Sequence, residues 1–370
     1  MTRLASVLTI FALLLAGTSV AQIATGTDPG AVADEAVATW LDRAEDFDMF
    51  ALASDSPAQL CSEYAFFGQD PNIVAGTIVN FDDRRLLPAD VEGQRVYSYS
   101  ARVGDTGLAR VRVLLSEVND SWHAEAVRLQ VEGIGAQLPG FMTHDAAGFV
   151  FIAFTLYLGV LLFRPSWFRR LLGRSWQVLK QHKGIVIGTI VVLYGAYGLG
   201  SMFGAGVPEC QEAVAAMVGG ALGETGVVDV LQDDNVPKTA AVITYWNFLY
   251  GTIATTLFPA FLFGIPAYLI NIPRYFVLGV ALAPVGPNVD LLVFHLPVIV
   301  IELMAYVLVT AGGLIFLMTL VREGFAAFRT ATQRLLLTLP IAFLLLVVGA
   351  WYESYEILRL IPMFTGAPPP

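Results

Sequence analysis

The chain has 370 residues, of which 56% are hydrophobic and only 14% are charged, and its formal net charge is −10. Soluble globular proteins carry about 25% charged residues, so this composition argues against a wholly soluble protein and indicates a membrane protein. The negative charge lies in residues 22–145, which hold 20 Asp and Glu against 8 Arg and no Lys. This acidic surface would repel phosphates and excludes nucleic acid as an expected partner.

Residues 1–21 have the features of a signal peptide. Arg3 precedes a short apolar run, and small residues lead up to Ala21, after which we expect cleavage. The apolar run is too short to span a bilayer comfortably, although an uncleaved anchor remains the alternative. Export would place the following residues, 22–145, outside the cytoplasm.

Residues 22–145 predict a small α+β extracytoplasmic domain. Residues 30–60 have apolar side chains at helical spacing, whereas the later segments 94–103, 108–117 and 122–131 alternate between apolar and polar residues, as strands do. Helices followed by an antiparallel sheet are typical of α+β domains. This order resembles the cone-shaped domains of the nuclear-transport-factor-two-like superfamily. That superfamily includes both enzymes and passive binders, so the resemblance implies little about chemistry.

Residues 146–370 predict an α-helical polytopic bundle of about six transmembrane helices, because one span needs roughly 20 apolar residues. The expected spans are residues 147–163, 184–203, 242–263, 265–287, 291–321 and 335–352, with an acidic external loop at 205–240. Basic residues follow the first and fifth spans: Arg164, Arg169, Arg170, Arg174, Lys180, Lys183, Arg322, Arg329 and Arg334. Positive charge in short loops marks the cytoplasmic side, so both mature ends are expected outside.

The two cysteines fall in segments that are both expected outside the cytoplasm. Cys61 belongs to the exported domain and Cys210 to the external loop. Disulfides form in such compartments, and two cysteines allow one pairing. A bond between them would fasten the exported domain to the bundle. Two separate buried thiols are the alternative.

Glu302 lies in the middle of the fifth predicted span, where an ionisable residue is a functional candidate because a charge in lipid is costly. In a helix, His295, Tyr306 and Gly313 share its face. Glu302 is interpreted either as a structural latch between helices or as part of a proton or ion path or a contact with a partner's helix. Arg274 is the candidate counter-charge.

Four further polar residues lie within or next to the predicted spans. Glu353 and Glu356 follow the last span beside aromatic residues, which predicts solvated acids in an interfacial belt. Asn247 and Asn271 are candidates to cap or link helices.

A spaced pattern of small and polar residues runs through residues 242–357. Its members, in chain order, are Asn247, Gly264, Leu278-Gly279, Pro297, Glu302, Ala305, Gly313 and Glu353. This pattern resembles the stage II sporulation protein M family of multi-pass membrane proteins. Val298 and Ile299 replace the family's His and Gly, and Arg274-Tyr275 replaces its Asn-Gly. The resemblance implies a non-enzymatic membrane component that assembles with envelope-remodelling partners, which in sporulating bacteria are peptidoglycan-degrading proteins.

No enzyme motif is present: the sequence has no His-Glu-x-x-His zinc site, P-loop or nucleophile elbow. We therefore expect no catalytic residue, cofactor or metal. The first hypothesis is a scaffold protein of the cell envelope in the bacterial cytoplasmic (inner) membrane, whose exported domain binds membrane or envelope proteins. The second is a transporter or channel subunit in which Glu302 lines a proton or ion path. An intramembrane enzyme would need a second catalytic group at membrane depth. Partner, substrate and oligomeric state are not determined by the sequence.

Overall fold

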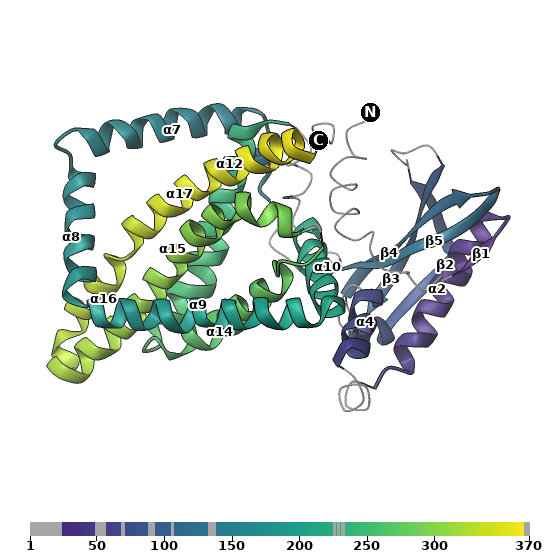
Figure 1. Ribbon diagram of the computed structural model, residues 1–370, viewed down its shortest axis with the longest axis horizontal. Helices are drawn as coiled ribbons and strands as arrows, with labels where there is room; N and C mark the ends of the chain where they lie inside the picture. Colours follow the sequence, from purple (N-terminus) through teal and green to yellow (C-terminus); the bar gives the residue numbers. More distant parts are fainter. Residues whose placement is uncertain are drawn as a thin grey trace.

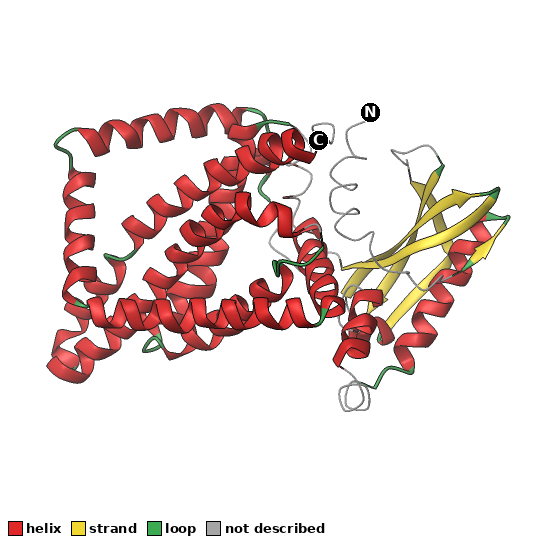
Figure 2. Cartoon of the chain, viewed as in Figure 1, coloured by secondary structure: helices red, strands yellow, loops and turns green. Residues whose placement is uncertain are grey.

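The computed structural model describes residues 24–48, 57–67, 71–87, 93–104, 107–131, 138–224, 227, 230, 234–286 and 288–365. Two parts are evident, a helical bundle and a small domain built on a sheet (Figure 1, Figure 2). The predicted signal peptide, residues 1–21, lies outside the described residues.

The small domain contains a five-stranded antiparallel sheet with helices on one face. Its elements are β1 (Thr25–Gly26), α2 (Pro29–Glu45), α4 (Pro57–Phe67), α5 (Pro71–Ala75), β2 (Thr77–Leu87), β3 (Gln94–Val103), β4 (Gly107–Val118) and β5 (Ser121–Val131). The strand order is β1-β5-β4-β3-β2. The three predicted strands correspond to β3, β4 and β5, whereas β1 and β2 were not predicted. The segment predicted as helical, residues 30–60, covers most of α2 and the first residues of α4.

Two local sequence signals, a helix cap and a tight turn, position elements of the sheet domain. Asp28 caps α2, because its carboxylate accepts a hydrogen bond of 2.9 Å from the Gly30 backbone N–H. Asn119 and Asp120 have φ angles of 54° and 60°, which allow the tight turn between β4 and β5. Trp40 of α2 is fully buried against the inward-facing residues of β4, so α2 and the sheet share one core.

The bundle holds the remaining helices. They are α6 (Gly140–Thr143), α7 (Ala146–Phe163), α8 (Trp167–Gln181), α9 (Lys183–Gly206), α10 (Pro208–Glu224), α12 (Val236–Trp246), η1 (Asn247–Leu257), α13 (Phe258–Phe261), α14 (Ile265–Ala281), α15 (Asn288–Glu323), η2 (Phe325–Ala327), α16 (Phe328–Leu336), α17 (Leu339–Tyr355), η3 (Glu356–Leu360) and α18 (Ile361–Thr365). The first long apolar helix of the bundle, α7, begins at Ala146, where the composition of the chain changes.

Among the described residues, four helical segments are long and apolar enough to cross a membrane, which indicates a membrane protein. They are Ala146–Phe163, Lys183–Gly206, Leu291–Glu323 and Phe325–Phe364, and Ile265–Ala281 is a shorter apolar helix. The predicted third and fourth spans correspond to α12–η1–α13 and α14. They meet at Phe263 and Gly264, whose φ angles of 59° and 74° break the helix. The six-span topology stays a prediction.

Two predicted spans differ in extent from the helices that contain them. The third span was predicted from residue 242, but α12 begins at Val236, because the Asn235 side chain caps it by accepting from the Lys238 N–H at 3.1 Å. The last span was predicted over 335–352, but that segment contains the junction of α16 and α17, and the helical path continues beyond it through η3 and α18 to Thr365.

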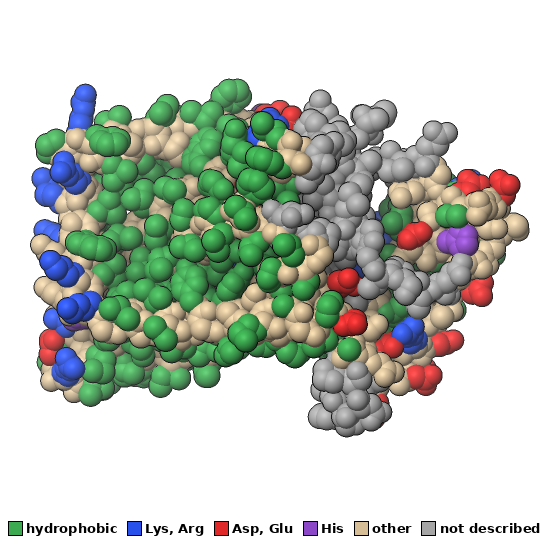
Figure 3. Space-filling model, in the orientation of Figure 1, with side chains coloured by type: hydrophobic (Ala, Val, Ile, Leu, Met, Phe, Trp, Pro, Cys, Tyr) green, Lys and Arg blue, Asp and Glu red, His purple; other side chains and the backbone are tan. Residues whose placement is uncertain are grey.

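The outer surface of the bundle is apolar around its sides and basic at one end. Large exposed side chains such as Phe149, Met202 and Val293 cover the sides. In Figure 3 the Lys and Arg side chains gather at the end remote from the sheet domain. The connections α7–α8–α9 and α15–α16 both lie at that end (Figure 1), so the two basic segments share one side of the bundle.

The backbones of helices α9 and α14 are in close contact where the two helices cross. A Cβ atom on Gly279 would lie 2.0 Å from the Tyr197 carbonyl oxygen, and one on Gly200 would lie 2.0 Å from the Phe276 carbonyl oxygen. Small residues let two helices approach this closely, so glycine is required at both positions.

Candidate functional site

The first part of the site is a contact between carboxyl groups on α15 and α17. These two helices pack along each other, and Gly349 of α17 faces the backbone of Glu302 on α15. The Glu302 and Glu353 carboxyl groups lie in hydrogen-bonding contact. Glu302 is about 16 Å along the helix from the Leu291 end of its span, at 1.5 Å per residue.

A third carboxyl group extends this contact toward the end of the bundle nearer the sheet domain. Glu356, the first residue of η3, acts electrostatically on Glu353 and is completely buried. Its Oε1 lies 3.0 Å from Nδ1 of His295, whose side chain is 27% exposed. The sequence predicted solvated acids here, which is wrong for Glu356. The helical path does not end after the last span, and its continuation turns these carboxyl groups toward α15.

On the other side of Glu302 lie a tyrosine and an arginine. The Tyr306 hydroxyl is 3.5 Å from Glu302 Oε1, and the Arg274 guanidinium stacks 4.2 Å from the centre of the Tyr306 ring. Arg274 also donates to the Gly251 carbonyl and the Thr255 hydroxyl, both at 3.3 Å. Arg274 thus lies among the helices, near enough to act electrostatically on Glu302 without a direct ion pair.

Uncharged polar side chains on α14, η1 and α15 form a separate cluster inside the bundle. The Asn271 amide donates to the hydroxyls of Thr256 and Thr310, both at 3.3 Å, and to the Ala267 carbonyl at 2.9 Å. Asn271, predicted to cap or link helices, links three elements. The threonines were not identified from the sequence, because threonine is common in apolar helices and carries no signal of its own.

Three other predicted site residues contribute to the shape and packing of the helices. Gly313 faces Gly264, and a Cβ on Gly313 would lie 2.8 Å from the Gly264 Cα. Pro297 lies inside α15, between His295 and Glu302. Asn247 begins the π-helical segment η1, and its carbonyl accepts from the Thr252 hydroxyl at 3.0 Å. These residues shape helices and their crossings.

The chemistry of the site follows from its three acids. Carboxylates that share an apolar site cannot all be ionised, and a hydrogen bond between two carboxyl groups needs a proton on one of them. Within the described part of the chain, no group of three or more His, Cys, Asp and Glu residues is arranged to hold a metal ion. Because it needs a proton, the Glu302–Glu353 contact can join two helices through that shared proton, or take up and release it.

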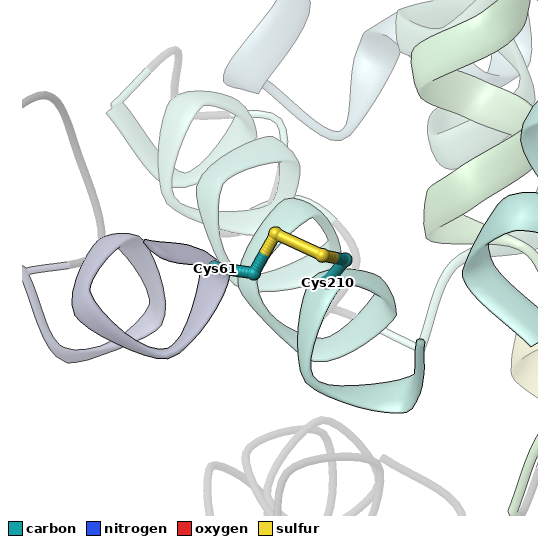
Figure 4. Close-up of a disulfide and its surroundings, with 2 residues drawn as sticks. All are labelled: Cys61 and Cys210. Carbon is teal, nitrogen blue, oxygen red and sulfur yellow. A yellow bond between two sulfur atoms is a disulfide. The ribbon is translucent and has the colours of Figure 1, made fainter. Parts of the chain in front are cut away.

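A second feature joins the two parts of the molecule. Cys61 of α4 and Cys210 of α10 form a disulfide with an S–S distance of 2.05 Å (Figure 4), and α4 packs along α10. Gln211, the next residue, donates from Nε2 to the Ala281 carbonyl at the end of α14, 2.9 Å away. The sheet domain is thus connected through α10 to the helices of the bundle.

Ion pairs hold the neighbouring helix ends together. Lys238 of α12 is only 3% exposed. Its Nζ lies 3.2 Å from Oδ1 of Asp145, the residue that precedes α7. Arg359 of η3 pairs with Asp234, which precedes α12. Both contacts fix the ends of helices on the side of the bundle that carries the sheet domain.

Comparison with known proteins finds no matching family model, curated protein or solved structure. The two resemblances noted from the sequence therefore stay predictions.

Proposed function

We propose that the chain is a non-enzymatic assembly protein of the bacterial cell envelope, held by six spans in the cytoplasmic membrane, with the sheet domain outside to bind partner proteins. The observation that carries the proposal is the fixed connection between the two parts. The Cys61–Cys210 disulfide and the packing of α4 on α10 give the sheet domain a set position above the bundle. Such a position suits a protein that presents a binding domain at a constant orientation.

The distribution of charge supports the proposed orientation. Basic residues gather at the bundle end remote from the sheet domain (Figure 3), and positive charge favours the cytoplasmic side. A disulfide is expected in an oxidising compartment, which supports the proposed location of the sheet domain outside the cytoplasm. The resemblance of residues 242–357 to the stage II sporulation protein M family points to the same class of role.

The carboxyl contact supports the assembly role from inside the bundle. α15 packs against α9, α16 and α17 and lies at the centre of the bundle. The Glu302–Glu353 contact fixes the position of α15 against α17, which also carries Glu356 at its end. We interpret Glu302 as the latch that keeps the helices aligned under the sheet domain.

The assembly role is tested by site-specific photo-crosslinking from the exposed sheet domain in the native bacterium, using wild type and the double variant C61S/C210S. At matched amounts of membrane-inserted protein, the double variant should lose its crosslinks. Arg322→Gln, at the remote end of the bundle, is the matched control and should keep them. If wild type forms no crosslinked product and runs alone on a native gel, the assembly role is wrong.

A transporter or channel subunit is the second candidate, and one observation favours it. Polar groups come from several elements, not from α15 alone: Glu356, Glu353, Glu302, Tyr306 and Arg274 follow one another through the bundle. Such a series is what a proton path requires. Measurement of proton flux separates the two candidates.

A further inference from the structure

Helix α8 runs across one end of the bundle, from the end of α7 to the start of α9. Figure 1 shows it crosswise to these two helices, at the end remote from the sheet domain. It has 15 residues and is therefore about 22 Å long, at 1.5 Å per residue. Since α7 and α9 are both long and apolar enough to cross a membrane, α8 lies at the level of the membrane surface.

One face of α8 packs on the bundle and determines which side of the helix faces outward. Phe168, Val178 and Leu179 are buried, and at 3.6 residues per turn they lie on one side of the helix. Phe168 shares an apolar cluster with Leu158 of α7 and Val347 of α17. The opposite side of α8 is consequently directed away from the protein.

Each flank of this packed face carries one tryptophan and two basic residues, all of them exposed. The first flank has Trp167, Arg170 and Arg174, and the second has Arg169, Trp176 and Lys180. Neighbours within each set are three, four or seven residues apart, which aligns their side chains along the helix. Tryptophan rings prefer the boundary between lipid and water, and long basic side chains reach from that boundary to the headgroups.

The positive charge of α8 is not balanced within the protein. Residues 164–183 contain no Asp or Glu, and in the described part of the chain Arg169, Arg170 and Arg174 make no side-chain ion pair. In the other basic segment, by contrast, Arg334 of α16 donates to Glu323, 2.9 Å away. Positive charge on a loop is enough to set topology, but topology does not require a packed helix with its cations aligned.

We propose that the outward side of α8 binds the headgroups of anionic phospholipids at the cytoplasmic surface of the membrane. Guanidinium groups match phosphate through paired N–H donors, and the cytoplasmic leaflet carries negative charge. Arg170 and Arg174 are about 6 Å apart along the helix axis, which lets both contact one headgroup or two adjacent ones.

The apolar surface beside α8 favours lipid over an acidic protein as the occupant. Phe163, the last residue of α7, is 87% exposed, so the surface that faces lipid chains extends to the segment that leads into α8. Exposed Trp167 and Trp176 continue this surface onto α8 itself. A soluble acidic partner would pair with the cations but would leave the tryptophans without a reason to be exposed.

The proposal does not depend on the assembly role and is tested on the full chain in nanodiscs, which expose both membrane surfaces. The discs contain equal parts of phosphatidylcholine and phosphatidylglycerol, and the acyl chains of one lipid or the other carry bromine, which quenches tryptophan fluorescence. The signal of the matching Trp167→Phe/Trp176→Phe protein is subtracted, so the remaining quenching comes from α8. The ratio of quenching by the two lipids measures the preference of α8 for the anionic one.

Two double variants are compared with wild type. Arg170→Gln/Arg174→Gln removes two cations from α8, whereas Arg322→Gln/Arg329→Gln removes the same charge from α15 and α16 at the same end of the bundle. We expect wild type to prefer phosphatidylglycerol and R170Q/R174Q to lower this preference about fivefold or more, the effect of one basic residue at an anionic surface. R322Q/R329Q should keep a preference close to that of wild type.

Three results would overturn the proposal. Equal quenching by the two lipids in wild type would assign the cations of α8 to an acidic protein instead. Equal loss in both double variants would indicate a general charge effect. A preference that high salt does not reduce would exclude contact with exposed headgroups, because salt screens such charges. The salt titration uses wild type, so it tests the proposal even if circular dichroism shows that R170Q/R174Q is unfolded.

Discussion

The sheet domain and the membrane bundle place their polar groups in opposite ways. In the sheet domain the interior around Trp40 is apolar, and ion pairs such as Arg84–Asp34 lie near the surface. In the bundle the sides are apolar, whereas Glu302, Glu356 and Asn271 lie inside. Water accepts charges that lipid does not, so a glutamate is unremarkable in one region and a candidate for function in the other.

The largest expected effect concerns the link between the two regions. The disulfide closes a sequence separation of 149 residues. In the chain-entropy view its loss costs about 4–5 kcal/mol, because the unfolded chain regains freedom. C61S/C210S should therefore unfold at a clearly lower denaturant concentration than wild type, measured by tryptophan fluorescence. A reducing agent should lower the stability of wild type but leave the double variant unchanged. An unaffected wild type would show that the link does not stabilise the molecule.

A substitution confined to the bundle should have the next largest effect. Gly279→Ala places a Cβ 2.0 Å from a backbone oxygen of α9, so α9 and α14 must separate. We expect a loss of about 3 kcal/mol, at the upper end for overpacking, measured as a fall in the melting temperature in detergent. Gly195→Ala, on α9, has no atom within 4 Å of the added Cβ and is the matched control. Equal melting temperatures for the two variants would contradict the close crossing.

The carboxyl contact predicts different results for two substitutions of one residue. Glu302→Leu leaves Glu353 buried without its partner, and we expect a loss of about 2 kcal/mol. Glu302→Gln can still donate to Glu353 and should lose less than about 1 kcal/mol. Thermal unfolding in the same detergent compares them. If Gln is as damaging as Leu, the shared hydrogen bond is not what stabilises the bundle.

The smallest expected effect lies in the sheet domain. The Tyr99 hydroxyl donates to Asp34 at 2.8 Å, and burial, followed by Asp34, raises the pKa of Tyr99 above its ordinary value of 10. The neutral hydroxyl thus stabilises the fold fully below pH 10, and this stability is lost as the pH rises above 10. Tyr99→Phe should cost about 1 kcal/mol at neutral pH and remove this dependence on pH. Denaturant unfolding at several pH values measures both.

The same contrast explains which features could be predicted from the sequence. Strands β3, β4 and β5 alternate in polarity and were predicted, but β2 was not. It contains the charged run Asp82, Asp83, Arg84 and Arg85, which hides the alternation. β2 tolerates this run because it is an edge strand whose register with β3 shifts between Asn80 and Arg84. An edge strand can keep charges on both faces in water.

In the bundle, apolar length predicted the four membrane-length helices, and Glu302 could be identified by its cost in lipid. The partners of Glu302 could not be identified in the same way. Glu353 and Glu356 follow an apolar segment beside aromatic residues, a pattern typical of a solvated interface. Only the packing of α17 and η3 against α15 brings these carboxyl groups inside, and such packing depends on residues about 50 positions apart.

Proton flux into proteoliposomes tests the assembly proposal most directly. Wild type and Glu302→Gln are reconstituted in the same orientation and amount, and internal pH is followed after an imposed pH gradient. If Glu302 is a latch, wild type should conduct no more protons than empty liposomes, and E302Q should behave alike. Flux through wild type that E302Q abolishes, with both proteins folded, would contradict the assembly role and establish a proton path through Glu302.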